Sequence, residues 1–103
     1  MSLLEQKVQS KLIKKLEQDG YYVIKLSVTN KNGIPDIIAI PRDSDVEFYE
    51  VKQKGKKPSE IQVYRMKELH NHGIKSFLYD GTFYSGHNYF SDSQEDEKKT
   101  DLF

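Results

Sequence analysis

GIPDIIAIPRDSDVEFYEVKQ, residues 33–53, carries the clearest structural pattern in the chain. Its two halves, residues 34–40 and 46–53, are rich in β-branched and aromatic side chains, which favour extended strands. Pro41 and the polar run at 42–45 lie between them and are typical of a turn. The stretch therefore predicts two antiparallel strands joined as a hairpin.

This hairpin gathers acidic and basic side chains on one patch. Side chains two positions apart on a strand project from the same face, so Glu50 and Lys52 should stand side by side. Asp36, at the start of the preceding strand, can approach Glu50 across the ladder. Two neighbouring carboxylates repel each other unless a cation lies between them, and a divalent metal ion is the usual cation. The alternative is a cross-strand salt bridge on an exposed sheet face.

The rest of the chain supplies two helices and further strands. Apolar residues recur at helical spacing in the first helix, and Asp19–Gly20 is a suitable end for it. Ser59 and Gln62 form a capping box that opens the second helix. The predicted elements are helix 3–16, strands 21–28, 34–40 and 46–53, helix 59–71, strand 74–79 and a short strand at 83–84. The order α-β-β-β-α-β predicts an α/β fold with a mixed sheet flanked by helices.

Two polar residues fall within the apolar stripes of these helices. At about 100° per residue, Glu5 lies in line with Leu12 and Leu16. Gln62 shares its line with Met66. Each has an ordinary explanation as well, because an acid in a first turn favours the helix dipole and a glutamine can complete a capping box. Both residues are nevertheless candidates for the same site as the acids of the hairpin.

Length and composition exclude several classes of protein. A chain of 103 residues, 36% hydrophobic and 31% charged, suits one small domain and excludes an enzyme with separate cofactor and substrate domains. With no cysteine there is no disulfide, thiolate nucleophile or cysteine zinc site. No apolar run approaches the roughly 20 residues that a membrane helix needs, and the first residues do not form a secretory signal. These features predict a cytoplasmic protein without a membrane partner.

The charge is unevenly distributed along the chain. Residues 92–103 carry five acids and two lysines, so this segment has a net charge of −3 and residues 1–91 have +3. We expect residues 1–91 to form a single domain and residues 92–103 to be an acidic, mobile tail. A mildly basic domain is compatible with a polyanionic partner without requiring one.

Taken together, the motifs resemble a known nuclease signature. Gly33-Ile34-Pro35-Asp36 followed by Glu50-Val51-Lys52, with Glu5 before them and Gln62 after them, resembles the PD-(D/E)XK pattern. The run GKKPSEIQ at 55–62, followed by Leu69 and Gly73, is similar to the VRR-NUC branch, whose stand-alone members are often encoded by phages. The resemblance covers about residues 3–80 and implies a restriction-endonuclease-like core without an added DNA-binding domain.

The resemblance implies a phosphodiester hydrolase that uses Mg²⁺ or Mn²⁺. Asp36 and Glu50 would ligate the ion together with the backbone carbonyl of Val51. Glu5 would be a further ligand or would act through a water molecule. Lys52 would position the attacking water and stabilise the transition state, and Gln62 would orient Lys52 or that water.

The same resemblance suggests a substrate and an assembly. Family members cleave DNA to leave a 5′ phosphate, and stand-alone members are linked to branched DNA such as Holliday junctions. A four-way junction has two-fold symmetry, so its resolution calls for two active sites in a homodimer. The protein would then work in the cytoplasm of a bacterium or a phage-infected host cell.

Further residues are candidates for contacts with DNA. Lys54, Lys56 and Lys57 lie next to the proposed metal site, where they would bind phosphates without reading the base sequence. The alternative is an ordinary solvated turn. Tyr64, two residues past Gln62, is also placed to face DNA. The run His70-Asn71-His72 is interpreted as a helix terminus rather than as a nuclease motif.

The end of the chain suggests a protein partner. Asp101-Leu102-Phe103 resembles the carboxy-terminal half of the short peptides that dock on bacterial sliding clamps. The alternative is that Leu102 and Phe103 pack on the domain or on a second subunit.

Three functions are therefore distinguished. The first is a structure-selective DNA endonuclease. The second is a restriction-like or flap nuclease, although so small a chain has little room for base-edge contacts. The third is a non-catalytic DNA-binding module of the same fold, and the intact set of Asp36, Glu50 and Lys52 argues against it.

Overall fold

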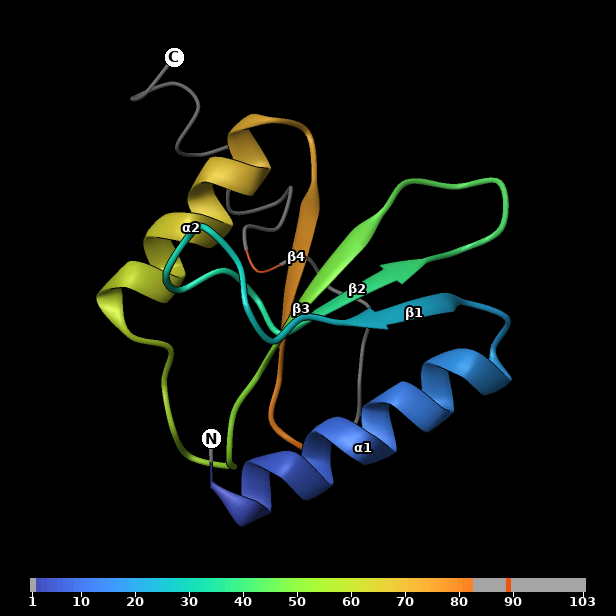
Figure 1. Cartoon of the computed structure of the whole chain (residues 1–103), viewed down its shortest axis with the longest axis horizontal. Coiled ribbons are helices and arrows are strands. Elements are labelled where there is room, and N and C mark those ends of the chain that lie inside the picture. Colours follow the sequence, from blue (N-terminus) through green and yellow to red (C-terminus); the bar gives the residue numbers. More distant parts are fainter. Residues whose placement is uncertain (1, 83–88, 90–103) are drawn as a thin grey trace.

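Two helices and four strands follow one another in the predicted order. The computed structural model describes residues 2–82 and 89. Its elements, shown in Figure 1, are α1 (Leu3–Gln18), β1 (Tyr22–Lys25), β2 (Ile37–Ile40), β3 (Glu47–Val51), α2 (Glu60–Asn71) and β4 (Lys75–Tyr79). The predicted α/β class and the order α-β-β-β-α-β are confirmed.

The strands form one mixed sheet in the order β1-β2-β3-β4. β1 pairs with β2 and β2 with β3 in antiparallel fashion, whereas β3 and β4 are parallel and joined through α2. The predicted hairpin is therefore present as β2 and β3. Its register sets Ile37 opposite Tyr49. Because the strands are antiparallel, Asp36 and Glu50 come next, opposite each other, just beyond this pair.

The first three strands are shorter than the sequence predicts. The expected strand 21–28 ends at Lys25, and the last bond of its ladder runs from Leu26 N–H to the carbonyl oxygen of Asp36 at 2.8 Å. Beyond this bond, residues 27–35 leave the sheet as a loop. Pro35 has no N–H to donate, which is consistent with a second strand that begins at Ile37 rather than at residue 34.

α1 covers one face of the sheet. Ser2 caps the helix by accepting a hydrogen bond from Glu5 N–H at 3.1 Å, and Asp19 closes its other end. Leu12 and Leu16 point into the core, as the apolar spacing predicts. The buried core comprises Leu12, Leu16, Ile37, Ala39, Tyr49, Val51 and Phe77.

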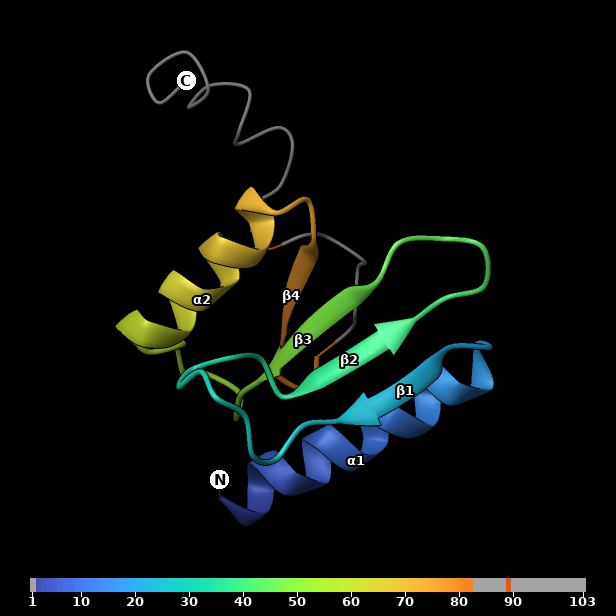
Figure 2. The same ribbon diagram turned by 45° about the horizontal axis from the view of Figure 1, so that its top comes forward.

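α2 lies on the opposite face. Tyr49 and Val51 project toward α1, so Glu50 between them projects toward α2. Figures 1 and 2 show α1 alongside β1 and α2 alongside β4, with the amino-terminal ends of the two helices near the end of the sheet where β3 stops. The predicted capping box is present, since Ser59 N–H donates to Gln62 Oε1 at 2.8 Å and Gln62 N–H donates to Ser59 Oγ at 3.3 Å.

Some predictions concern other parts of the chain. The short strand at 83–84, the tail at 92–103 and its clamp-docking residues Asp101, Leu102 and Phe103 lie outside the described residues. Within residues 2–82, no helix has both the length and the apolar character that crossing a membrane requires.

Candidate active site

The predicted acids meet at one end of the sheet. Asp36 lies just before β2, Glu50 lies in β3, and Glu5 comes from the amino-terminal part of α1. Each is placed by a hydrogen bond. Asp36 Oδ2 accepts from Val51 N–H at 2.9 Å, and Glu5 Oε2 accepts from Gln53 N–H at 3.2 Å. Helix α1 belongs to the other face of the sheet, and Glu5 joins the group because its helix begins at the sheet's end.

Glu50 is the most buried of these acids, with 1% of its surface exposed. Its Oε2 accepts a hydrogen bond from Gln62 Nε2 at 3.0 Å. Its Oε1 is buried and has no hydrogen-bond partner among the described residues. Gln62 therefore serves two purposes at once, because its amide oxygen completes the capping box while its amide nitrogen holds Glu50.

Burial and like charge change the ionisation of the acids. Burial raises the pKa of Glu50 to about 9, and the carboxylates of Asp36 and Glu5 contribute to the rise, while Lys52 opposes it. Burial also raises the pKa of Asp36, although the hydrogen bond from Val51 N–H partly offsets the effect. Without a cation, Glu50 thus holds its proton at neutral pH.

This ionisation predicts how stability depends on pH. In the unfolded chain Glu50 loses its proton near its ordinary value of 4.5, whereas in the folded chain it keeps the proton up to about pH 9. Between these values the unfolded chain binds fewer protons. The free energy of unfolding of the metal-free protein should therefore fall as pH rises across this window, by up to about 1.4 kcal/mol per pH unit. Urea denaturation in chelator at several pH values measures this slope.

The control is the Glu50→Gln variant, which removes this titration and leaves the other groups in place. The difference between parent and variant isolates the contribution of Glu50. Parallel pH profiles for the two proteins would show that Glu50 does not hold a raised pKa in the folded chain.

The donors at this site suit a hard divalent cation. Carboxylate oxygens are the ligands that Mg²⁺ and Mn²⁺ prefer. A cation between Asp36 and Glu50 would replace the proton of Glu50 and give the unpartnered Glu50 Oε1 a partner. Among residues 2–82 and 89, no three acidic or histidine side chains are already arranged around a common metal position. The pair Asp36 and Glu50 fits the ion directly, while Glu5 is engaged with Gln53 N–H.

Lys52 stands beside the two acids. It follows β3 directly, its backbone N–H donates to the carbonyl oxygen of Tyr79 at 2.9 Å, and its side chain is half-buried. Its positive charge lowers the pKa values of both Asp36 and Glu50. The structure therefore brings together Glu5, Asp36, Glu50, Lys52 and Gln62, whose roles remain predictions.

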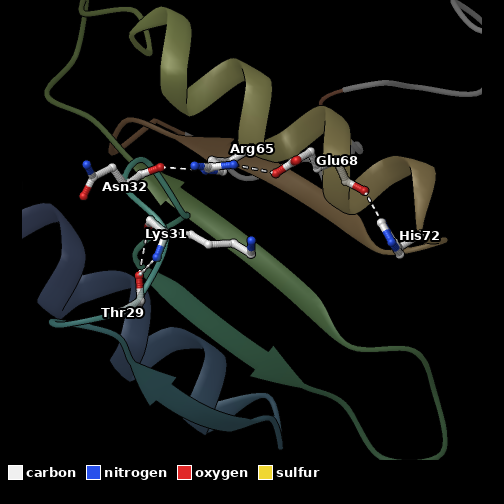
Figure 3. Close-up of polar contacts among 6 residues, drawn as sticks. All are labelled: Thr29, Lys31, Asn32, Arg65, Glu68 and His72. Atoms are coloured by element: carbon white, nitrogen blue, oxygen red, sulfur yellow. Dashed lines mark hydrogen bonds and ion pairs between the residues drawn. The ribbon is translucent and has the colours of Figure 1, made fainter.

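The loop before Asp36 is fastened to α2 by an arginine. Figure 3 shows Arg65 between the two elements, with its Nε donating to the carbonyl oxygen of Asn32 at 2.8 Å and its Nη1 donating to Glu68 Oε1, also at 2.8 Å. Within the loop, Thr29 Oγ1 accepts from Lys31 N–H at 3.2 Å. The position of Asp36 is thus tied to the helix that carries Gln62.

Gly33 permits the close approach of this loop to α2. Its φ is +82°, and a Cβ atom there would lie 2.9 Å from the Ile61 side chain and 3.0 Å from the Ile61 backbone. Gly33→Ala should therefore lower the free energy of unfolding by on the order of 2 kcal/mol or more, through both backbone strain and the clash. Cleavage should fall as well, because the loop that leads to Asp36 must move. Urea denaturation and a cleavage assay measure the two effects.

Gly73→Ala is the matched control for this substitution. Gly73 has nearly the same φ, +83°, but no atom within 4 Å of an added Cβ. The Gly73→Ala variant therefore measures the loss in free energy of unfolding that the backbone conformation alone causes. Equal losses in the two variants would mean that the contact of Gly33 with Ile61 has no energetic importance.

The predicted DNA-contacting residues lie at the surface. Lys54, Lys56 and Lys57 are exposed in the segment between β3 and α2, next to the acids. Tyr64 is 55% exposed, but it lies roughly 200° around α2 from Gln62 and so points away from the acid group. His72 is at the carboxy-terminal cap of α2, in agreement with its interpretation as a helix terminus.

One polar residue near the site was not predicted from the sequence. Gln9 lies one turn after Glu5 in α1 and is 2% exposed. At about 100° per residue it falls within the same stripe as Glu5, Leu12 and Leu16, so helical spacing could have revealed it.

Comparisons with known proteins agree with the architecture. Among solved structures, the chain is similar to one described as a VRR_NUC domain, with a TM-score of 0.70 and 24% sequence identity. The likeness covers 99% of this chain and 100% of that chain. No protein-family model and no curated protein matches the sequence. At this identity the likeness establishes the fold, which is the one expected from the resemblance of the motifs.

Proposed function

We propose that the chain is a divalent-metal-dependent nuclease of the PD-(D/E)XK type that hydrolyses phosphodiester bonds in DNA. The observation that carries the proposal is the buried acid Glu50, whose Oε1 has no partner among the described residues, next to the half-buried Asp36 and Lys52. A buried acid beside a second acid destabilises the fold, and such groups are often found at functional sites. The likeness to a VRR_NUC domain supports the same conclusion.

The acids would bind the metal ion in the proposed reaction. Asp36 and Glu50, with the backbone carbonyl of Val51, would hold Mg²⁺ or Mn²⁺. The ion would supply Lewis-acid activation of the phosphate and of the attacking water. Glu5 would act as a further ligand or through a water molecule.

The other two side chains act on the nucleophile and on the acids. Lys52 would orient the water and neutralise charge that develops on the phosphate in the transition state. Gln62 would keep Glu50 in place, since its amide already donates to that carboxyl group. The lysines at 54, 56 and 57 would bind flanking phosphates.

The finer part of the proposal concerns the substrate. We infer branched DNA such as a four-way junction, cut to leave 5′ phosphates by a homodimer. Support for a dimer comes from the edge strand β1, where Tyr22 is 69% exposed and Ile24 is 39% exposed on the face away from α1. Apolar side chains on an edge strand are suited to cover by a second copy. A monomer in gel filtration at assay concentrations would count against junction resolution.

The test is incubation of the purified protein with labelled linear duplex, flap, splayed-arm and four-way junction DNA. Each substrate is tested with Mg²⁺, with Mn²⁺ and with chelator, and the ends are analysed for 5′ phosphate. We expect cleavage only with metal and fastest on the junction. Cutting of duplex at defined sequences would instead support a restriction-like enzyme. Binding without cleavage under every condition would support a non-catalytic DNA-binding module.

The proposed partner of the tail is tested separately. We propose that Asp101, Leu102 and Phe103 dock on a bacterial sliding clamp. Deletion of Leu102 and Phe103 should abolish capture of the protein on immobilised clamp while cleavage of DNA continues. Undiminished capture after the deletion would show that the two deleted residues do not bind the clamp.

A further inference from the structure

A glutamine on α1 has no role in the fold or in the proposed reaction. Gln9 is 2% exposed and sits among the apolar residues that α1 turns toward the sheet. None of the hydrogen bonds among residues 2–82 and 89 involves its side chain. Its amide atoms are not among the fully buried polar atoms that lack a partner, so the end of the side chain reaches solvent. A carboxamide that is fixed between a helix and a sheet and is still open to solvent is placed to donate to a ligand.

Gln9 lines a cavity that reaches the acid group. The cavity has a volume of about 270 Å³ and lies between α1 and the end of β1. Its lining residues are Gln6, Gln9, Lys25, Leu26, Ser27 and Asp36. Leu26, Ser27 and Asp36 also line a second hollow of about 330 Å³ under the loop that precedes β2. The two hollows therefore lie against the same short segment, and Asp36 lines both of them.

Several side chains of the cavity can donate hydrogen bonds. Val23 packs toward the core, so Lys25, two positions further along β1, projects from the same face toward α1. Lys25 is exposed and places an ammonium group at the rim, while Gln9 and Ser27 add an amide and a hydroxyl. An ammonium, an amide and a hydroxyl are the side-chain groups that contact phosphate and sugar oxygens of DNA.

We propose that this cavity binds the sugar–phosphate backbone of the cleaved strand, next to the phosphate that is hydrolysed, and that Gln9 donates a hydrogen bond to it. The inference rests on the proposed nuclease function, since Asp36 marks where the reacting phosphate lies. The volume approaches the lower limit of about 300 Å³ that is typical of small-ligand sites, which suits a single nucleotide unit. Gln9 is thus a substrate-binding residue, and Lys25 is its charged neighbour.

The test separates this role from a structural one by the sign of the change in stability. Gln9→Leu keeps the size of the side chain and removes the unpaired amide. We expect its melting temperature in chelator to rise by about 4 °C or more, because an apolar group then occupies an apolar face. We expect KM for oligonucleotide cleavage to rise about 10-fold, the loss of one hydrogen bond to a charged group, while kcat stays within about 3-fold.

Two further variants complete the experiment. Gln18→Leu is the matched control on an exposed part of α1, and it should leave KM and the melting temperature close to those of the parent. Lys25→Gln lies at the exposed rim, so it should fold normally. It should weaken the binding of a labelled oligonucleotide in chelator and reduce the salt dependence of that binding by about one phosphate contact.

The outcomes distinguish this inference from the proposed function. A less stable Gln9→Leu variant with parental KM and binding would show that Gln9 is structural and would overturn the inference. The same holds if the parent cleaves DNA and both Gln9→Leu and Lys25→Gln bind oligonucleotide as the parent does. If the parent cleaves nothing but binds oligonucleotide in a manner that depends on Gln9 and Lys25, the binding site stands and the nuclease proposal fails.

Discussion

Glu50→Gln should yield a protein that is more stable than the parent in chelator and unable to cleave DNA. The folded parent holds Glu50 protonated at neutral pH, because burial and the charges of Asp36 and Glu5 raise its pKa to about 9. At pH 7 the raised pKa of Glu50 should lower the free energy of unfolding by on the order of 3 kcal/mol, since the carboxyl group ionises freely in the unfolded chain. Glutamine has nearly the same shape, can accept the hydrogen bond from Gln62 and does not ionise. We expect a rise in melting temperature of roughly 10 °C.

The same substitution should remove the response to metal. Mg²⁺ or Mn²⁺ should raise the melting temperature of the parent, because binding to the folded chain alone stabilises it. The variant lacks one of the two carboxylates that would hold the ion, so its melting temperature should not depend on metal and its cleavage should be undetectable. Thermal melts with and without metal, together with a cleavage assay, measure these effects.

Glu60→Gln is the matched control, since Glu60 is exposed in the first turn of α2. It should leave metal stabilisation and cleavage unchanged. If Glu50→Gln melts below the parent in chelator, or is stabilised by metal as much as the parent, then Glu50 is not the strained metal-binding acid inferred from its burial.

Lys52→Met should abolish cleavage without weakening DNA binding. The substitution preserves much of the apolar stem and removes the amine that stands beside Asp36 and Glu50. Loss of a group that stabilises charge only in the transition state costs about 10²- to 10³-fold in rate, and a group that also orients the water costs more. We therefore expect a fall of about 10³-fold or more in the single-turnover rate. Affinity for DNA, measured by fluorescence anisotropy in chelator, should change less than about 3-fold.

Lys54→Met is the comparison variant for Lys52→Met, because it should affect DNA binding rather than the cleavage rate. Lys54 is exposed, two residues beyond Lys52, and is proposed to bind a flanking phosphate. Its loss should weaken binding and reduce the salt dependence while the rate at saturating DNA stays near that of the parent. A Lys52→Met variant that cuts at the parental rate would show that the assigned mechanism is wrong.

Much of the fold could be read from local patterns. The order of elements, the hairpin and the capping box of α2 follow from side-chain spacing, turn residues and caps, which act over a few neighbouring positions. The ends of the strands could not be read in this way. Residues 26–28 are as suitable for a strand as those before them, and β1 ends at Lys25 because the chain leaves its partner after the bond from Leu26 to Asp36. A strand end depends on a partner elsewhere in the chain.

In the candidate site, too, some features follow from the sequence and others depend on the tertiary structure. Alternation along β3 predicts that Glu50 and Lys52 share a face, and the antiparallel hairpin predicts that Asp36 is near. The dual contact of Gln62, with Ser59 and with Glu50, required the packing of α2 against the sheet. Helical spacing places Gln9 on the apolar face of α1, but the cavity beside it is formed by residues far along the chain and depends on the tertiary structure.

The linear order of residues was enough to establish the element order, the faces of the helices and strands, and the identity of the acids and the lysine, because these depend on periodicity and on chemistry that each residue carries with it. Folding in three dimensions decided which of these groups meet and what surrounds them. Glu5 reaches the acids of the opposite sheet face because α1 starts at the sheet's end, and its bond to Gln53 joins positions 48 residues apart. The raised pKa of Glu50 likewise arises from burial by segments that are distant along the chain, which local sequence does not encode.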